Sequence, residues 1–184
     1  MRKLFILLSL LLLLTGCSLF HNGEAISGQI KGGTIIPDSA GTIYIISFTG
    51  GTNGAEFNNE FARRLKRIIN LDGRLSVVES VDESDLILDA SPVRYSEENV
   101  RFDETGRPVL RRISITVRVT LSEKSTGRII IKDKETDLFT EYNPDSAIMN
   151  DVYRELADRS SAAVLSIILT GWAVDTSPRD TRDL

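Results

Sequence analysis

The 184-residue sequence is poor in the side chains that most often bind metals or perform acid–base catalysis, since it has one cysteine and one histidine. One cysteine excludes an internal disulfide framework and a cysteine-rich zinc site. The histidine is His21, close to the N-terminal leader, which argues against a histidine-based catalytic centre in the folded part. The net charge of -4 argues against a general nucleic-acid-binding protein.

Motifs for nucleotide binding and ester hydrolysis are also missing. A Gly-rich stretch at 49–54 follows an apolar run, but no Gly-Lys-Ser/Thr triplet occurs there, so it predicts a tight turn. No Gly-x-Ser-x-Gly elbow occurs, and acidic pairs such as Asp82-Glu83 fall in expected turns. We therefore predict no catalytic residue, no cofactor and no metal site, although oxygen ligands alone could still form a metal site.

What the sequence does contain begins with its leader, MRKLFILLSLLLLLTGC. Arg2 and Lys3 precede an apolar stretch at 4–14, which is shorter than the ~20 residues that span a bilayer core. The length and the basic flank are typical of a secretory signal peptide. Leu-Thr-Gly-Cys at 14–17 resembles the bacterial lipobox, in which the cysteine takes a diacylglycerol and the leader is cut just before it.

Cys17 is therefore the predicted lipid-attachment residue, and residues 1–16 are the predicted lipoprotein signal peptide. A lipidated cysteine needs no redox or catalytic role. Ser18 follows it, and resemblance to the usual sorting rule, in which Asp at this position retains a lipoprotein in the inner membrane, indicates the outer membrane. We expect the mature protein on the periplasmic side of the cell outer membrane, held there by its lipid.

Composition divides the mature chain into a tether, one folded domain and a tail. Residues 17–40 are rich in Gly, Ser and polar residues, which predicts a lipidated N-terminus and tether. Residues 41–172 carry the periodic apolar patterns and form a single domain, since the length leaves little room for two. Residues 173–184 are polar and contain Pro178 and three aspartates, which predicts disorder.

The clearest element in the domain is a half-buried strand at 112–121, where five apolar residues alternate with five polar ones. Pro92 marks the strand before it as an edge strand or a bulged one. Pro144 predicts the start of the second helix. The predicted strands are 41–48, 75–79, 84–95, 112–121 and 128–140, with helices at 54–70 and 143–172 and a polar loop at 96–109.

This order, β-α-β-β-β-β-α, predicts an α/β two-layer sandwich. Each helix has one apolar stripe, so both can pack on one face of a four- to five-stranded, mostly antiparallel (mixed) sheet. The other face keeps polar side chains outward.

Basic residues gather in the second half of the domain. Between residues 91 and 134 the chain has ten basic and six acidic residues, although the protein is acidic overall. Strand parity places Arg112 and Arg118 on the outward face, and Arg128, Lys132 and Lys134 share a phase on the next strand. If the two strands pair, all five line one surface that suits phosphate or carboxylate groups, unless it is an ordinary solvated face.

The order and spacing of these features resemble the LPS-assembly lipoprotein LptE family from Cys17 to Trp172. The features that carry the resemblance are the lipobox at 14–17, Ile35-Ile36-Pro37-Asp38 leading into the strand 42–48, the helix 57–69, Gly73-Arg74-Leu75, Ser84-Asp85-Leu86-Ile87-Leu88, the alternating strand 112–121, and Gly171-Trp172 after the last helix.

The resemblance implies the same two-layer fold and a partner, an outer-membrane β-barrel of the LptD type in which the lipoprotein sits as a plug. It also implies a non-enzymatic task, which is to help assemble the barrel and deliver lipopolysaccharide to the outer leaflet. Basic residues of the family contact the phosphorylated lipid. The matching candidates are Arg112, Arg118 and Lys132 foremost, with Arg128 and Lys134.

Two other readings remain open. One is a lipoprotein adaptor of another family, such as a secretion-channel subunit or an accessory protein of a cell-wall synthase. A channel subunit needs long amphipathic segments, and the hairpin at 111–140 is the one candidate. The other is a lipid-modifying hydrolase, which would need a nucleophile and a base that the sequence does not offer.

Overall fold

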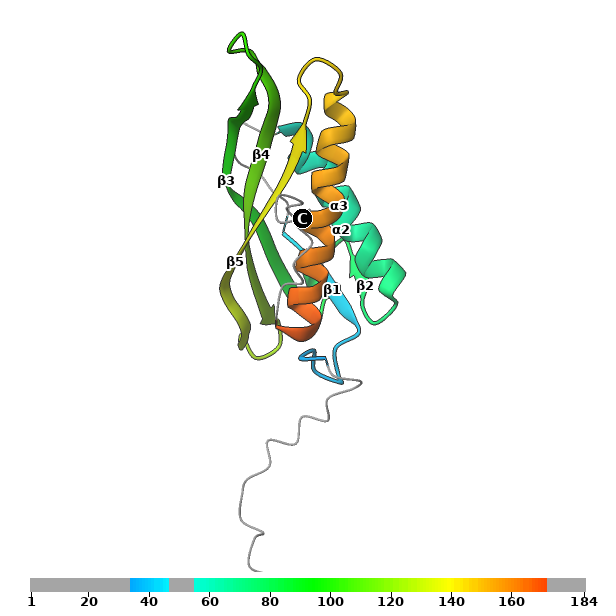
Figure 1. Ribbon diagram of the computed structural model, residues 1–184. Coiled ribbons are helices and arrows are strands. Elements are labelled where there is room, and N and C mark those ends of the chain that lie inside the picture. Colours follow the sequence, from blue (N-terminus) through cyan, green and yellow to red (C-terminus); the bar gives the residue numbers. More distant parts are fainter. Residues whose placement is uncertain (1–33, 47–54, 172–184) are drawn as a thin grey trace, which may run out of the picture.

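Two helices lie along one face of a five-stranded sheet in the computed structural model, which describes residues 34–46 and 55–171 (Figure 1). The order β-α-β-β-β-β-α and the two-layer arrangement are confirmed. The signal peptide, Cys17, the tether up to residue 33, the last two residues of the predicted strand 41–48, the whole Gly-rich stretch at 49–54 and the tail from residue 172 lie outside the described residues.

The sheet is mixed, with the strand order β2-β1-β3-β4-β5. β1 is parallel to both of its neighbours, whereas β3, β4 and β5 form an antiparallel meander. The strands are β1 (Thr42–Ile45), β2 (Ser76–Val78), β3 (Leu86–Phe102), β4 (Pro108–Glu123) and β5 (Ile129–Tyr142).

The first helix follows β1 and covers the parallel half of the sheet. α2 (Ala55–Asp72) buries Phe57, Phe61, Leu65 and Ile69, which lie on one stripe at the spacing the sequence predicted. The two phenylalanine rings stack with their centroids 5.6 Å apart. Gly73 follows at φ 79°, a left-handed conformation that glycine adopts without a steric penalty, and the helix ends at Asp72, two residues beyond the predicted end.

The polar loop expected at 96–109 is wrong, because both hairpin strands continue through it and meet in a turn at 103–107. Asp103 closes this turn by accepting bonds from Thr105 and Arg107. This part of the hairpin extends past the helices in Figure 1. Most side chains in this part are polar and exposed. The alternation of apolar and polar residues that identifies a half-buried strand is therefore missing from its sequence.

Pro92 lies at a bulge in β3, so the bulge alternative is confirmed and the edge alternative is not. The register with β4 shifts between Pro92 and Arg94. The shift accommodates a residue that has no N–H to donate, and β3 remains an inner strand between β1 and β4.

The second helix begins later than predicted, since α3 runs over Met149–Thr170. Asn143 forms a turn instead, in which its side-chain oxygen accepts from the Asp145 N–H and its carbonyl accepts from Ala147. An Asn-Pro pair suits such a turn as well as it suits a helix start. α3 ends at Gly171, which has φ 78° and donates to the carbonyl of Ile167.

One continuous core lies between the sheet and the two helices. β4 contributes its whole apolar row, Ile113, Ile115, Val117, Val119 and Leu121, each at most 3% exposed. α3 buries two serines, and Ser160 and Ser161 satisfy their hydroxyls on the carbonyls one turn back. The sequence pattern of β4 therefore identified the buried face of the sheet correctly.

Candidate functional site

The outward face of β3, β4 and β5 is the candidate site, because no helix in the described part covers it and three of the five predicted basic residues belong to it (Figure 1). The middle strand, β4, presents a polar row there consisting of Arg112, Ser114, Thr116, Arg118, Thr120 and Ser122.

Arg112 and Arg118 point outward, as predicted, and both are already paired with carboxylates. Arg112 binds Glu141 at 2.6 Å and lies 4.5 Å above the Phe139 ring. Arg118 donates to Glu135 from both Nε and a terminal nitrogen, at 3.1 and 2.8 Å. This pairing and hydrogen bonding raise the pKa of Arg118, which therefore stays charged.

The expectation that Arg128, Lys132 and Lys134 share one outward phase is wrong. Lys134 lies opposite Val119, so it belongs to the helix-facing side. Lys132 follows the buried Ile131 and remains outward and exposed. Arg128 precedes β5, in the turn, where its Nε is 3.5 Å from Glu123.

A bulge at Asp133 is the physical reason that Lys132 and Lys134 face opposite sides of the sheet. Asp133 has φ 46°, and the register with β4 moves from Val119–Lys134 to Leu121–Ile131 across it. One additional residue in a strand inverts the facing of everything beyond it. The structure thus brings Arg112, Arg118 and Lys132 to one face and excludes the other two candidates.

This face is balanced in charge rather than basic. The segment 91–134 carries +4, but the rest of β5 adds three carboxylates and no cation, which lowers the total to +1. Glu141 and Glu135 lie directly opposite Arg112 and Arg118 of β4, and Asp137 lies opposite Thr116. Apart from the bulge, the charged side chains of the face are Arg94, Arg101, Arg112, Arg118 and Lys132 against Asp89, Glu98, Glu135, Asp137 and Glu141.

A polar cluster on the helix-facing side escaped the sequence analysis. Glu97 accepts from the Tyr142 hydroxyl and from Arg111 at 3.2 Å, and the Nε of Arg111 is buried with no hydrogen-bond partner in the described part. Burial raises the pKa of Tyr95, and a hydrogen bond with Tyr153 of α3 raises it further. Burial likewise raises the pKa of Tyr142. These tyrosines therefore stay protonated and act as hydrogen-bond donors.

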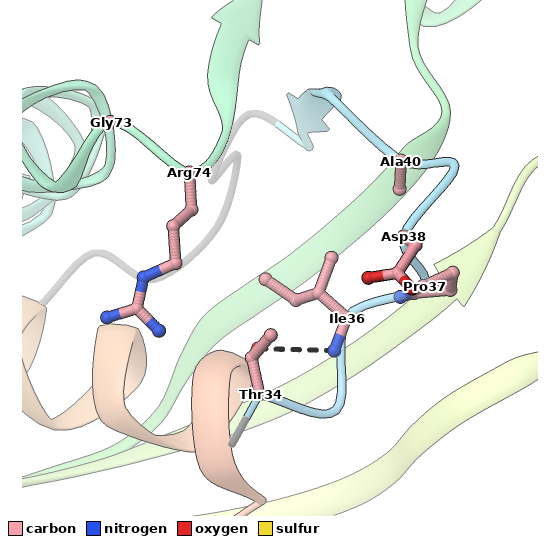
Figure 2. Close-up of a pocket in the computed structure, with 7 residues that line it drawn as sticks. All are labelled: Thr34, Ile36, Pro37, Asp38, Ala40, Gly73 and Arg74. Carbon is pink, nitrogen blue, oxygen red and sulfur yellow. Dashed lines mark hydrogen bonds between the residues drawn. The ribbon is translucent and has the colours of Figure 1, made fainter. Parts of the chain in front are cut away.

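A pocket of about 420 Å³ lies at the opposite end of the domain from the β3–β4 turn. Residues 34–40, which composition places in the tether, pack across the end of α3 here and form one wall. Figure 2 shows the Arg74 side chain extending toward α3, with Asp38 on the other side of Ile36. Arg74 is paired with Asp72 at 2.9 Å.

Neither site contains a metal-binding constellation, since residues 34–46 and 55–171 hold no group of three or more potential ligands. Among the same residues no helix is long and apolar enough to cross a membrane.

With this geometry in view, comparison with known families is decisive. The family model described as LptE, lipopolysaccharide-assembly, matches residues 40–166, which is well over half of the chain. The chain belongs to the LptE family. A second model, the prokaryotic membrane lipoprotein lipid attachment site, matches residues 1–18 and includes Cys17. The protein is therefore a lipid-anchored membrane lipoprotein of lipopolysaccharide assembly.

Solved structures that are similar to this LptE-family protein include two lipoproteins. The chain is similar to the uncharacterized lipoprotein B of Nitrosomonas europaea, with a TM-score of 0.50, 16% identity, and coverage of 76% of this chain and 90% of that one. It is also similar to the rare lipoprotein B of Shewanella oneidensis, with a TM-score of 0.48, 10% identity, and coverage of 68% and 91%. No curated protein matches the chain.

Proposed function

We propose that this LptE-family protein is anchored in the outer membrane, plugs and helps assemble a β-barrel of the LptD type, and assists the delivery of lipopolysaccharide to the outer leaflet. In this role the protein binds and positions its partners and performs no chemical step. The observation that carries the proposal is the LptE family match across the whole sheet, α2 and most of α3.

The outward sheet face suits a plug. The lumen of an outer-membrane barrel is polar, so a protein inside it needs a hydrophilic surface without a broad apolar patch. The row on β4 has that character, with two arginines held in ion pairs and small hydroxyl side chains between them. Paired charges of this kind can exchange partners with a polar wall at little cost in desolvation.

Lipopolysaccharide contact is assigned to the same face, with an order of priority among the candidates. Lys132 comes first, because it is exposed and has no ion-pair partner among the described residues. Arg118 comes second, since its side chain is 47% exposed and its bond to Glu135 lies at the surface. Arg112 comes last, because its side chain is 25% exposed and it also packs on Phe139.

The plug proposal is tested by isolating the tagged lipoprotein from detergent-solubilised membranes and identifying the chains that copurify. A single large outer-membrane β-barrel in about equal amount supports the proposal. Recovery as a self-oligomer, or with a cell-wall synthase, contradicts it and favours an adaptor.

Lipid contact is tested separately by charge reversal. Lys132→Glu combined with Arg118→Glu should weaken lipopolysaccharide binding by about tenfold, because charge-assisted bonds to phosphate are lost. Arg63→Glu is the matched control, since Arg63 is an exposed, ion-paired arginine on α2. Surface plasmon resonance on immobilised lipopolysaccharide gives the affinities. Unchanged binding of the double variant would mean that this face is an ordinary solvated surface.

A further inference from the structure

The end of the domain from which the tether departs has features that the barrel-plug function does not explain. This anchor end consists of residues 34–41, the last turns of α2 and α3, the short 3-10 helix η2 (Val81–Glu83) and the β4–β5 turn. The Ile35 N–H donates to Leu169, and Lys124 donates from its backbone to Asp85 and from its side chain to Asp82. Hydrogen bonds therefore join residue 35 to the end of α3, and the β4–β5 turn to η2 and the start of β3.

Large apolar side chains are exposed around this end. Leu71 at the end of α2 is 72% exposed, and Ile129 beside the β4–β5 turn is 52% exposed. Ile35 and Val81 are exposed on neighbouring segments. Phe102 and Ile148 are exposed elsewhere on the domain, so apolar exposure alone does not distinguish this end, and the position of the lipid anchor does.

The lipid anchor determines what this surface meets. The chain between Cys17 and Thr34 can span at most about 60 Å, and it enters the described domain at this end. The β3–β4 turn lies at the far end, about 50 Å away along β3. Tethering raises the effective concentration of the nearer end at the bilayer, so even weak contacts there become populated.

The charge of the anchor end indicates the kind of lipid. Its acidic residues outnumber its basic ones, which disfavours an anionic membrane. The charged residues are Asp38, Asp72, Asp82, Glu83, Asp85 and Glu123 against Arg74, Lys124 and Arg128.

The pocket at this end offers both charges that a zwitterionic headgroup needs. Arg74 uses its Nε and one terminal nitrogen on Asp72, which leaves other guanidinium N–H groups to donate. The Asp38 carboxylate has no hydrogen bond or ion pair among the described residues. Ile36, Pro37 and Ala40 supply apolar walls between the two charges (Figure 2).

We propose that the anchor end rests on a bilayer of zwitterionic phospholipid and that the pocket takes one phospholipid headgroup, with its phosphate on Arg74 and its ammonium group on Asp38. The polar hairpin end then points away from the membrane. This arrangement belongs to the lipoprotein before it meets a barrel, so it does not depend on the proposed function.

The test uses the mature, lipidated protein in vesicles of phosphatidylethanolamine and phosphatidylcholine that contain no barrel. The chain has one cysteine, and the lipid blocks it, so an introduced cysteine is the single thiol that a polarity-sensitive fluorophore can label. Ile129→Cys reports the anchor end, and Phe102→Cys is the matched control at the hairpin end because Phe102 is 53% exposed. We expect a severalfold increase in emission at Ile129→Cys and none at Phe102→Cys.

Equal increases at both positions, or an increase at Phe102→Cys alone, would overturn the proposed orientation. The headgroup site is tested in the Ile129→Cys background by Arg74→Gln and Asp38→Asn, each of which should remove most of the increase. Arg63→Gln on α2 is the control for loss of a surface charge. A full increase in both pocket variants would contradict the headgroup site, and a larger increase on phosphatidylglycerol vesicles would contradict the choice of zwitterionic lipid.

Discussion

One carboxylate, Asp85, joins the first strand to the rest of the sheet. Its Oδ2 accepts from the backbone N–H groups of Gly41 and Thr42 at 2.9 Å each and from the Thr42 hydroxyl at 2.8 Å. The hydrogen bond from Gly41 is the main reason that the pKa of Asp85 lies below its ordinary value of 3.8, and the bonds from Thr42 add to the shift. The ionised form is thus the form that stabilises the fold.

Replacing this residue gives a prediction with a defined pH dependence. Asp85→Asn should lower the free energy of unfolding by about 1–2 kcal/mol at neutral pH, a modest value because solvent screens this surface site. Since the folded pKa is depressed, the advantage of the wild type is complete above the ordinary pKa and disappears as the pH falls through the folded pKa. Urea unfolding of both proteins between pH 7 and pH 3 measures it.

Asp82→Asn is the matched control for that measurement. Asp82 is a nearby carboxylate whose side chain is 91% exposed and lies 3.8 Å from Lys124. Its replacement should change stability by less than about 0.5 kcal/mol. If Asp82→Asn were as destabilising as Asp85→Asn, the stabilisation would come from general charge and not from the bonds to the first strand.

Residue identity alone could predict which way Arg112 and Arg118 point but not what they bind. Parity in β4 is a local property, so the alternating row at 112–121 predicted it correctly. Their partners, Glu141 and Glu135, depend on the register with β5, and that register contains a bulge. No local sequence pattern around Asp133 indicates the bulge, so parity in the sequence placed Arg128 and Lys134 on the outward face. The carboxylates of β5 beyond residue 134 balance the arginines that do lie there.

At the scale of elements, the conformation at that bulge determines which side chains of β5 face outward. Asp133 adopts φ 46°, in the left-handed region that costs most residues about 1–2 kcal/mol. Its N–H donates to the Thr120 hydroxyl at 3.2 Å, which compensates in part for the interrupted ladder. The bulge also twists an edge strand, which reduces its tendency to pair with other chains.

Two substitutions of Asp133 should change the free energy of unfolding in opposite directions. Asp133→Gly should raise the free energy of unfolding by about 0.5 kcal/mol, because glycine enters the left-handed region without strain. Asp133→Val should lower it by about 1–2 kcal/mol, because a β-branched side chain clashes there. Thermal unfolding followed by circular dichroism checks both, and a stabilising valine would show that the bulge is absent in solution.

Element boundaries could be predicted where burial is one-sided and not elsewhere. α2 and the core part of β4 are half-buried, so their apolar stripes identified both elements, with the ends of α2 within two residues. The outer part of the β3–β4 hairpin is exposed on most of its length, and polar side chains there resemble a loop. At Asn143-Pro144 a turn and a helix start have the same local chemistry, and packing of α3 against the core decides between them.

At the scale of the whole molecule, membrane attachment depends on one residue far from the fold. Cys17→Ser should leave an unlipidated precursor that retains residues 1–16, because the thiol that accepts the diacylglycerol is gone. Mass spectrometry of the protein and its partition into detergent measure the effect. Ser18→Ala should be processed normally, and a processed Cys17→Ser protein would show that cleavage does not use the lipobox.

The position of β1 inside the sheet affects the order in which the sheet can assemble. Ile43 pairs with Val77 on one side and with Leu86 on the other, so the earliest strand of the domain lies between two strands that follow it in the chain. During export, N-terminus first, β1 has no neighbour to bond until Val78 has crossed the inner membrane, and it gains its second neighbour only after Leu88 has crossed. The first strand to leave the translocon therefore has both edges unpaired until β2 follows, and one edge unpaired until β3 follows.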